Sequence, residues 1–547
     1  MATQAAPQKL AGAFYTPPEV ARCIVRWAVR NSADTVLDPS FGEGVFLRAS
    51  AERIDSLGGI GQKQVCGVEI DMKTLEKARS TLQIQQLVLS DFFDVQSGHL
   101  PTFDAVVGNP PFIRYQHFKG EIRENALRSA NRLGVSLSEL TSSWAPFLVH
   151  AAEFVGSNGR LAMVLPTEML HASYARPVVH FVLERFASVQ LALFTERLFP
   201  DLNQDTLILF ADKHGSRCSE LRVRRFESLL KLEETLETAS SFGEPVCLSD
   251  VSSTNGRLRN HFLDKEVADL YRFLQADPRS ARLGELAQVG IGYVTGCNDY
   301  FHFTIEESHH YRIPDRYLVP TLANHGILRG LCFTEMDWNE AAQQGEAVYL
   351  VDIPRLPFSK LPKSVRHYIA RGRRLRINRA YKCSVRKPWF SVPHGSPAQA
   401  FLSYMSGTAP RICWNSASVL ATNSTHEVRF GPIVAFEPWK LAFTFWCSLT
   451  QLSCEIEGHP MGGGMLKLEP SEAESVLVIR PENTKISWEQ FLELDALMRQ
   501  KSTASAIDLA DDVILRETLG LSWEQIQVIR DGLDLMRSSR RKRIGKN

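Results

Sequence analysis

Residues 35–47 read TVLDPSFGEGVFL, which is an apolar run, a turn with two glycines and the start of an amphipathic stretch. This order predicts a strand, a turn and a helix, the unit from which doubly wound α/β sheets are built. Gly42 and Gly44 allow the backbone to approach a ligand closely, and Asp38 places an acceptor beside them. A dinucleotide site would need a third glycine where Leu47 stands, so the turn fits a ligand without a pyrophosphate. Taken alone, the motif fits a purely structural turn equally well.

The same alternation of short apolar runs and amphipathic stretches continues from about residue 10 to residue 215. It predicts a Rossmann-like doubly wound sheet, in which the carboxyl ends of parallel strands form the ligand crevice. Several of the expected strands end in a residue that can do chemistry. These strands are 35–37, 65–69, 86–89, 103–107, 159–165, 189–194 and 206–210.

Two of these strand ends add acceptors to Asp38. The carboxylate of Glu69 can accept both hydroxyls of a ribose. Asp91 and Phe92, after the next strand, offer an acceptor and an aromatic face for an adenine ring. Either acid alone is more often a helix cap or a solvated side chain. Three such ends in this order indicate a site for a nucleoside-like ligand.

A fourth strand end is the corner Asn109-Pro110-Pro111-Phe112, which follows the apolar run 103–108. Two consecutive prolines cannot continue a strand or a helix, so the chain must turn into a stiff, extended corner. Asn109 both donates and accepts hydrogen bonds, the Pro110 carbonyl accepts, and Phe112 supplies a flat face. This set suits a planar base held by its exocyclic amino group, although the turn by itself could merely end a buried strand.

Together, these motifs resemble those of the S-adenosylmethionine-dependent DNA adenine-N6 methyltransferases. The resemblance is carried by Asp-Pro-x-x-Gly-x-Gly from Asp38, then Glu69, Ser-Asp-Phe at 90–92 and Asn-Pro-Pro-Phe at 109–112. Upstream, the run 13–20 resembles the Phe-x-Thr-Pro motif that this family uses near the methionine part of the cofactor, and Thr16 is its threonine. Because the cofactor motifs precede Asn109 and a large region follows it, the chain is similar to the gamma group. The resemblance implies a class I methyltransferase fold, S-adenosylmethionine as cofactor and double-stranded DNA as substrate.

The resemblance also assigns roles at the corner. Asn109 and the Pro110 carbonyl would hold both amino hydrogens of a flipped adenine, while Phe112, which replaces a tyrosine common in the family, stacks on the base. Phe199, with Phe194 behind it, is the expected second stacking ring. Arg114, in the segment after the corner, is expected to contact the DNA backbone, although a solvated loop fits almost equally well.

The second half of the chain carries a basic run. Between Lys360 and Lys387 there are eleven Lys/Arg residues and no Asp or Glu, interleaved with aromatic residues. In a chain of net charge +1, such a run favours phosphate contacts over an ordinary solvated face. The expected DNA-binding residues there are Arg371, Arg373, Arg374 and Arg376. The glycine-containing stretches 289–301 and 462–470, and Asn423 to His426, resemble target-recognition domains of the same family.

The sequence therefore predicts four regions. They are a catalytic methyltransferase domain over 1–215, a connecting region over 216–285, a mixed α+β target-recognition domain over 286–480 and a helical segment with a basic tail over 481–547. No apolar run is long enough for a membrane span and the N-terminus lacks a signal-like core, so we expect a cytoplasmic protein. The scattered cysteines and histidines show no ligand spacing, so no metal site is expected.

The expected function is site-specific adenine-N6 methylation of DNA by a monomer, within a restriction or phage-defence system. No carboxylate-plus-lysine cluster of a nuclease is evident, so a cognate endonuclease would be encoded separately. Two alternatives remain open at this point. Protein-glutamine and ribosomal-RNA methyltransferases use the same Asn-Pro-Pro-aromatic corner, and a non-catalytic DNA-binding subunit could retain a vestigial pocket.

Overall fold

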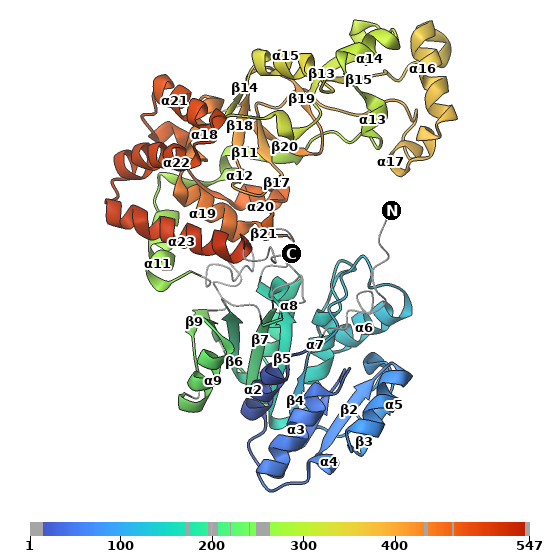
Figure 1. Ribbon diagram of the computed structural model, residues 1–547, viewed down its shortest axis with the longest axis vertical. Coiled ribbons are helices and arrows are strands. Elements are labelled where there is room, and N and C mark those ends of the chain that lie inside the picture. The colour runs from blue at the N-terminus through green and yellow to red at the C-terminus, as the bar shows by residue number, and fades with distance from the viewer. Residues whose placement is uncertain are drawn as a thin grey trace. The chain divides into compact units, whose positions relative to one another are not determined.

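The structure is a computed structural model that describes residues 15–170, 174–194, 198–199, 206–218, 220–239, 241–247, 263–431, 436–461 and 464–541. The chain divides into two compact units, Met1–Phe262 (unit 1) and Leu263–Asn547 (unit 2) (Figure 1).

Unit 1 is built on a nine-stranded sheet with the order β3-β2-β1-β4-β5-β7-β6-β8-β9. Strands β3, β2, β1, β4 and β5 are parallel, β7 is antiparallel to both of its neighbours, and β8 runs parallel to β6. The strands are β1 (Val36–Asp38), β2 (Val65–Glu69), β3 (Gln86–Leu89), β4 (Phe103–Gly108), β5 (Val155–Pro166), β6 (Phe186–Phe194), β7 (Thr206–His214), β8 (Glu220–Phe226) and β9 (Glu244–Cys247).

Helices cover both faces of this sheet. Helices α2 and α3 pack together, and α2 lies on β4 and β5, while α7 lies on β5 between α6 and α8. The helices of unit 1 are α2 (Pro18–Ala28), α3 (Val45–Ser56), α4 (Gly61–Gln64), α5 (Met72–Thr81), α6 (Gly120–Arg132), α7 (Trp144–Ala152), α8 (Ala175–Leu183) and α9 (Leu229–Thr238), with 3-10 turns η1 (Phe92–Asp94) and η2 (Thr167–Leu170). The expected doubly wound α/β fold is confirmed.

The central strands form because their residues are apolar on both faces. Every residue of 159–166 in β5 is buried, as are all three residues of β1. A continuous apolar run suits a parallel strand that helices cover on both sides. Each of the seven expected strands is present, with ends that shift by a few residues.

The sheet extends beyond the expected end of the catalytic domain at residue 215. Strand β8 pairs with β6, and β9 pairs with β8, so both belong to unit 1 and not to a connecting region. In β8, Leu221 and Val223 are buried, whereas Arg222 is half-buried and Arg224 is exposed. This alternation indicates a strand with one covered face. Its charged residues made the strand look like part of a connecting segment in the sequence. The boundary between the units lies after Phe262.

Unit 2 is mixed α+β. Its sheets have the orders β11-β20-β16-β18-β14, β12-β15-β13-β19, β17-β22-β21 and β10-β23. The strands are β10 (Ser280–Arg282), β11 (Ala287–Ile291), β12 (His302–Phe303), β13 (Leu318–Leu322), β14 (Cys332–Phe333), β15 (Tyr349–Val351), β16 (Ala400–Ser403), β17 (Met405–Ser406), β18 (Ile412–Asn415), β19 (Leu420–Ala421), β20 (Thr425–Phe430), β21 (His459–Pro460), β22 (Leu466–Lys467) and β23 (Leu477–Ile479).

The helices of unit 2 are α11 (Lys265–Gln275), α12 (Leu283–Leu286), α13 (Asn298–Phe301), α14 (Ile305–His310), α15 (Glu335–Gln343), α16 (Lys363–Arg374), α17 (Tyr381–Ser384), α18 (Pro438–Thr444), α19 (Ser448–Glu457), α20 (Pro470–Ser475), α21 (Trp488–Arg499), α22 (Thr503–Asp511) and α23 (Trp523–Arg541), with 3-10 turns η4 (Asp315–Tyr317), η5 (His325–Ile327), η6 (Phe358–Lys360), η7 (Ile377–Arg379) and η9 (Pro481–Asn483) and a π-helix, η10 (Asp512–Thr518). Many helices of unit 2 lie toward its two ends, with α18, α21, α22 and α23 at one and α14, α16 and α17 at the other (Figure 1). Helix α23 packs on α19 and α11, so the C-terminal helices are part of unit 2. Among the described residues, none of the helices combines the length and the apolar character that crossing a bilayer requires.

Candidate active site

Four polar residues follow four neighbouring strands in unit 1. Asp38 ends β1, Glu69 ends β2, Asp91 lies two residues beyond β3, and Asn109 directly follows β4. These strands are adjacent and parallel in the order β3-β2-β1-β4, so their carboxyl ends meet at one edge of the sheet. The row of strand-end residues expected from the sequence is therefore present. An α/β sheet binds its ligands at this edge.

The Glu69 carboxylate is held by backbone N–H groups. The amide of Gly42 donates to Oε2 at 3.0 Å, and the amides of Ile70 and Asp71 donate to Oε1 at 2.9 Å each. Gly42 and Gly44 have φ of +52° and +76°, a region that glycine enters without strain, and Gly44 caps α3. The glycine turn is thus tied to the end of β2, and the carboxylate keeps one orientation.

Asp38 is a buried carboxyl group with one unused oxygen. It is 1% exposed; Oδ1 accepts from the Ser40 amide at 3.2 Å, and Oδ2 has no partner in the part of the chain that the structure describes. Burial, opposed by the Ser40 hydrogen bond and assisted by the nearby Glu69 carboxylate, raises the pKa of Asp38 to about 8. A buried carboxyl with an unsatisfied oxygen fits a positively charged ligand group, because a cation offsets the cost of ionising it.

The third strand end differs from the expectation at its aromatic residue. Asp91 Oδ1 accepts from the Phe93 amide at 3.0 Å and so caps a 3-10 turn, and burial raises the pKa of Asp91. Phe92 is buried, and its ring packs on Phe147 and His150 of α7 with centroids 4.9 Å and 4.6 Å away. The Phe92 ring therefore packs inside the core, where it supports the turn.

The corner itself holds Asn109 in one orientation. Asn109 Nδ2 donates to Thr16 Oγ1 at 3.1 Å, and the Asn109 carbonyl accepts from Ser40 Oγ at 3.5 Å. Asn109 Oδ1 is buried and has no partner among the described residues. The amide thus leaves its acceptor oxygen for an N–H group that the described protein does not supply. Ser40 also links the corner to the turn that follows Asp38.

Ser143, which the sequence analysis missed, braces the other side of the corner. Its hydroxyl donates to the Pro111 carbonyl and accepts from the Ile113 amide at 2.8 Å, while its own amide donates to the Ile113 carbonyl at 3.0 Å. Ser143 is buried directly before α7. The only hint in the sequence was a run of hydroxyl residues, 141–143, ahead of an apolar helix.

Glu168 was also missed. It lies in η2, just after β5, and accepts from Trp144 Nε1 at 3.3 Å and from Ser142 Oγ at 3.5 Å. Trp144 Nε1 also donates to the hydroxyl of Tyr174 at 3.2 Å, and burial raises the pKa of Tyr174 well above its ordinary value. The cluster joins the end of the neighbouring strand to the helix that starts beside Ser143.

Thr16 was expected in the cofactor site, and its hydrogen bond gives it a measurable role at the corner. We expect Thr16→Val to lower kcat on the order of tenfold, because it removes the acceptor that fixes the Asn109 amide, while Thr16→Ser keeps activity near the wild-type level. Single-turnover methylation and cofactor titration of both variants check this. A loss of cofactor affinity with unchanged kcat would contradict the prediction and favour a role in cofactor contact alone.

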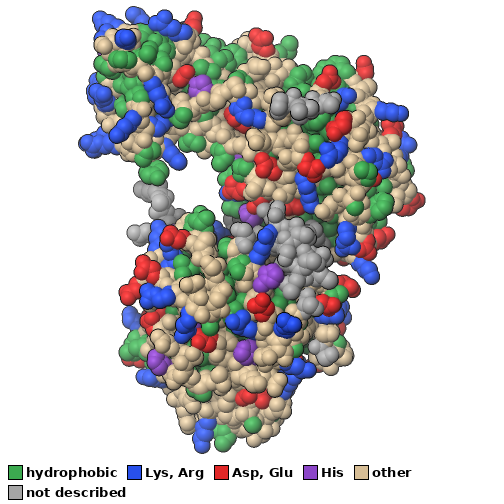
Figure 2. Space-filling view, turned by 180° about the vertical axis from the view of Figure 1, so that it is seen from behind, with side chains coloured by type: hydrophobic (Ala, Val, Ile, Leu, Met, Phe, Trp, Pro, Cys, Tyr) green, Lys and Arg blue, Asp and Glu red, His purple; other side chains and the backbone are tan. Residues whose placement is uncertain are grey.

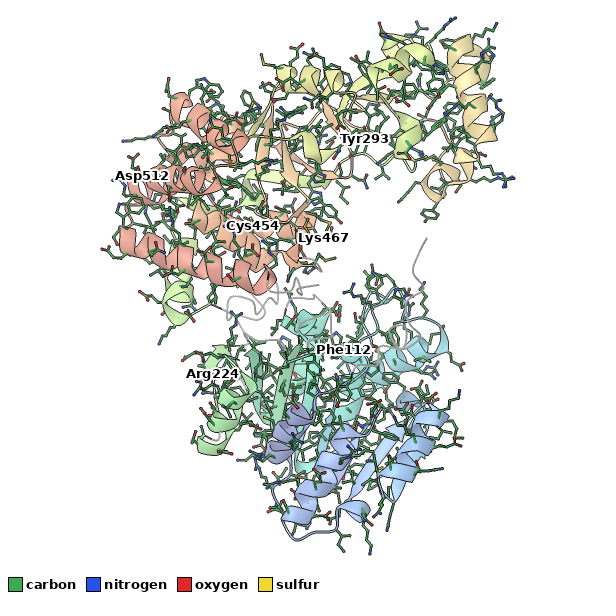
Figure 3. The ribbon with its side chains drawn as sticks, in the orientation of Figure 1. Phe112, Arg224, Tyr293, Cys454, Lys467 and Asp512 are labelled. Atoms are coloured by element: carbon green, nitrogen blue, oxygen red, sulfur yellow. The ribbon has the colours of Figure 1, made fainter. Side chains whose placement is uncertain are left out.

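The expected stacking rings are both largely covered by protein. Phe112 follows β4 at the end of the sheet and is 7% exposed (Figure 3). Phe199 is buried in the same hydrophobic core, and residues 195–197 and 200–205 around it lie outside the described residues. Phe194 packs on Phe226 with a centroid distance of 6.2 Å. No ring contact between Phe112 and Phe199 is found among the described residues.

The expected DNA-binding residues lie in two places. Arg114 is exposed in unit 1, five residues after Asn109. Arg373, Arg374 and Arg376 are exposed in unit 2, and Arg371 is half-buried there. The described residues hold no group of three or more His, Cys, Asp or Glu side chains arranged for a metal ion.

Family models match both units of the chain. The N-6 DNA Methylase model matches residues 1–225, and the model of the C-terminal domain of the Type II methyltransferase M.Eco57I matches residues 255–515. The chain is also 23% identical over 478 residues to the Type II methyltransferase M.AccI of Acinetobacter calcoaceticus, and the match covers 85% of each protein. Residues 1–225 therefore carry an N-6 DNA methylase domain.

Other relatives are consistent with this match. The Type II methyltransferase M.HindII of Haemophilus influenzae is 22% identical over 303 residues, which cover 53% of this chain and 55% of that protein. Among solved structures, the Type IIL restriction-modification enzyme MmeI in complex with DNA has a TM-score of 0.52 at 12% identity, over 95% of this chain and 75% of that one. This likeness supports the fold of the chain.

The comparisons therefore support a restriction-modification DNA methyltransferase that transfers a methyl group from S-adenosylmethionine to the N6 amino group of adenine. These comparisons favour adenine methylation of DNA over the alternatives of a protein-glutamine methyltransferase, a ribosomal-RNA methyltransferase or a non-catalytic DNA-binding subunit. Asp38 with its unused buried oxygen, the fixed Glu69 carboxylate and the capped α3 turn fit the cofactor, which carries a sulfonium, an ammonium and a ribose.

Proposed function

We propose that the chain is a gamma-group, site-specific methyltransferase that acts on an adenine flipped out of duplex DNA. The order of its parts supports the group: Thr16, Asp38, Glu69 and Asp91 precede Asn109, and all of unit 2 follows. The observation that carries the proposal is the unused Oδ1 of Asn109, held in place by Thr16 beside the cofactor turn. This oxygen is a ready acceptor for the adenine amino group.

Asn109 and Pro110 act by position. The lone pair of the adenine amino nitrogen is delocalised into the ring, so attack on the methyl group requires that nitrogen to become more tetrahedral. Acceptors at Asn109 Oδ1 and the Pro110 carbonyl hold both amino hydrogens and favour that change. A neutral amide is a poor base, so the proton leaves after methyl transfer, when the amino product is positively charged and acidic.

Other residues hold the two ligands. Asp38 faces a positive group of the cofactor, Glu69 accepts from the ribose hydroxyls, and Asp91 accepts from the adenine end. Phe112 forms one wall for the flipped base, and Phe199 is the proposed opposite wall. Base–aromatic stacking contributes roughly 1–3 kcal/mol, which is comparable to the few kcal/mol that flipping costs.

The proposal extends to the setting of the enzyme. A monomer in the cytoplasm would modify the cell's own DNA, and a separately encoded endonuclease would cut unmodified DNA. Arg114 next to the corner would contact the phosphates that flank the flipped base.

Long-read sequencing of host DNA tests the proposed function. The wild-type chain, expressed in a host that lacks adenine methylation, is expected to place N6-methyladenine at nearly every copy of one short DNA sequence. The Asn109→Ala variant, expressed at the same level, is expected to leave the DNA unmodified. The proposal is overturned if no such sequence emerges, or if modification persists in the variant.

A further inference from the structure

The basic run of unit 2 folds into a compact helical element. We call residues 363–387 the basic hairpin; it consists of α16, η7 and α17. The chain turns between α16 and η7 at Arg376, whose φ of 60° lies in the left-handed region that non-glycine residues seldom adopt. In α16, Val365, Tyr368, Ile369 and Gly372 are buried, so the helix has one side fixed to the protein.

Aromatic contacts anchor α16. The rings of Tyr300 and Tyr368 stack at 4.5 Å, each hydroxyl donates to the backbone carbonyl of the other residue, and the Tyr300 bond is 2.8 Å long. A Cβ added to Gly372 would lie 2.4 Å from the Trp389 ring and 2.5 Å from the Tyr300 hydroxyl, so the helix approaches these rings as closely as a glycine permits. The Arg371 guanidinium lies 4.9 Å from the centre of the Tyr311 ring.

The far end of the hairpin is anchored as well. The Thr295 carbonyl accepts from Arg386 Nη2 and from Cys383 Sγ, the latter at 3.6 Å. The Arg386 guanidinium also lies 5.3 Å from the centre of the Phe301 ring. Both helices of the hairpin are thus held against α13 and the residues before it, and the side chains that project from the hairpin start from a fixed backbone.

The outer surface of the hairpin combines cations with apolar side chains. Tyr381 is 76% exposed, Val385 64% and Leu375 54%. The exposed cations of the hairpin are Lys363, Arg373, Arg374, Arg376, Arg379, Lys382 and Lys387, and Lys382 Nζ lies 5.8 Å from the centre of the Tyr381 ring. None of these cations forms an ion pair within the described part of the chain, whereas other cations of unit 2 do, such as Arg499 with Asp337. Figure 2 shows Lys and Arg side chains gathered with hydrophobic ones at this end of unit 2.

We propose that the basic hairpin is a preformed DNA-contacting element in which Tyr381, flanked by Leu375 and Val385, inserts against the bases in a groove of duplex DNA. The cations of the hairpin contact phosphates, and the inference rests on the proposed function. An aromatic ring that is three-quarters exposed, on a hairpin that carries seven exposed cations without an ion-pair partner among the described residues, matches side chains that wedge between base steps while the backbone is neutralised. Phosphate contacts alone need no exposed apolar groups on the same hairpin.

Site-specific crosslinking tests the placement of Tyr381. The photoreactive residue p-benzoylphenylalanine is placed at 381 in the full chain, and the probe is a labelled 40-base-pair duplex of mixed sequence. A crosslink to DNA is expected. The matched control carries the same residue at Phe273, which is 66% exposed on α11 toward the opposite end of unit 2, and is expected to give none (Figure 1). Absence of a crosslink at 381, or equal crosslinking at both positions, overturns the proposal.

The salt dependence of DNA binding distinguishes the contribution of Tyr381 from that of the cations. Tyr381→Ala is expected to weaken binding of the same duplex on the order of tenfold at every salt concentration, with an unchanged slope of log Kd against log salt. The double variant Arg373→Gln, Arg374→Gln is expected to lower that slope by about 2. Wild-type affinity of Tyr381→Ala overturns the proposal. Unchanged DNA binding together with Tyr381-dependent binding to phosphatidylserine vesicles overturns it in favour of a membrane surface.

Failure of this inference can be told from failure of the proposed function. If the wild-type chain methylates DNA and the hairpin variants bind and methylate as it does, only the inference falls. If the wild-type chain fails to methylate any DNA, the proposed function falls. Tyr381 is exposed, so its replacement should leave the melting temperature unchanged, which verifies that each variant is folded.

Discussion

Replacing Asn109 by alanine is expected to lower methyl transfer to duplex DNA by at least about 10³-fold, because a positioned acceptor that acts in the transition state supplies roughly 10²–10³ and the Thr16 contact is lost with it. The backbone of the corner should persist, since the two prolines and Ser143 hold it without the amide. Cofactor affinity should therefore change by no more than about threefold, or about 0.65 kcal/mol.

Two measurements decide this prediction. Transfer of labelled methyl groups to DNA gives the rate, and calorimetric titration gives cofactor affinity. Asn131→Ala serves as the matched control, because Asn131 is an exposed residue of α6, and it should behave as wild type in both assays. A rate within tenfold of wild type for Asn109→Ala would remove Asn109 from the catalytic role. A parallel loss of cofactor affinity would show that the variant disrupts the site as a whole.

Local sequence patterns predicted the sheet because the strands of unit 1 are continuous apolar runs. A strand that helices cover on both faces must be apolar throughout, and its last residue is then free to be polar. For this reason Asp38, Glu69, Asp91 and Asn109 stood out, and the structure brings them to one edge. Strand β8 was not predicted, because a strand with one covered face alternates charged and apolar residues and resembles a charged connecting segment.

Contacts between distant segments could not be predicted in this way. Ser143 reaches the corner from 32 residues beyond Pro111, and nothing in its immediate sequence names that partner. Phe92 follows a strand end, as a ring that faces a ligand would. Whether its ring faces a ligand or the core depends on α7, where it packs on Phe147 and His150. The same reasoning applies to Thr16, whose hydrogen bond to Asn109 spans 93 residues. Each of these contacts depends on how distant segments pack together, which the sequence of one strand does not determine.

The second large effect concerns Asp38 and pH. Burial, with a smaller contribution from the Glu69 carboxylate, raises the pKa of Asp38 to about 8, so this carboxyl is protonated in the cofactor-free protein at neutral pH. A folded pKa above the unfolded one gives stability that is fully present below the unfolded pKa, near 4, and that is lost as pH rises through 8. Between pH 6 and pH 8 the wild-type protein should therefore lose about 2 kcal/mol of unfolding free energy relative to Asp38→Asn.

Denaturant unfolding of both proteins at the two pH values checks the stability effect. The comparison with Asp38→Asn removes contributions from groups that do not interact with Asp38. Two groups do interact with it: Glu69, whose charge raises the pKa of Asp38, and Cys66, whose thiol pKa is raised to about 11 by burial and by Asp38. Cys66 stays protonated throughout this range. If the difference between the two proteins is the same at pH 6 and pH 8, Asp38 does not titrate as expected.

Cofactor binding should reverse the protonation of Asp38. A sulfonium or ammonium beside the unused Oδ2 favours the ionised carboxylate, so binding below pH 8 releases a proton, and affinity rises by up to tenfold per pH unit until about pH 8. Calorimetry at pH 7 in two buffers that differ in ionisation enthalpy measures that proton directly, with nearly one proton released per bound cofactor for the wild type. Asp38→Asn should bind more weakly at pH 8, release no proton and show no such pH slope. Equal proton release by wild type and variant would show that a group other than Asp38 titrates. It would also contradict the proposal that Asp38 faces a positive group of the cofactor.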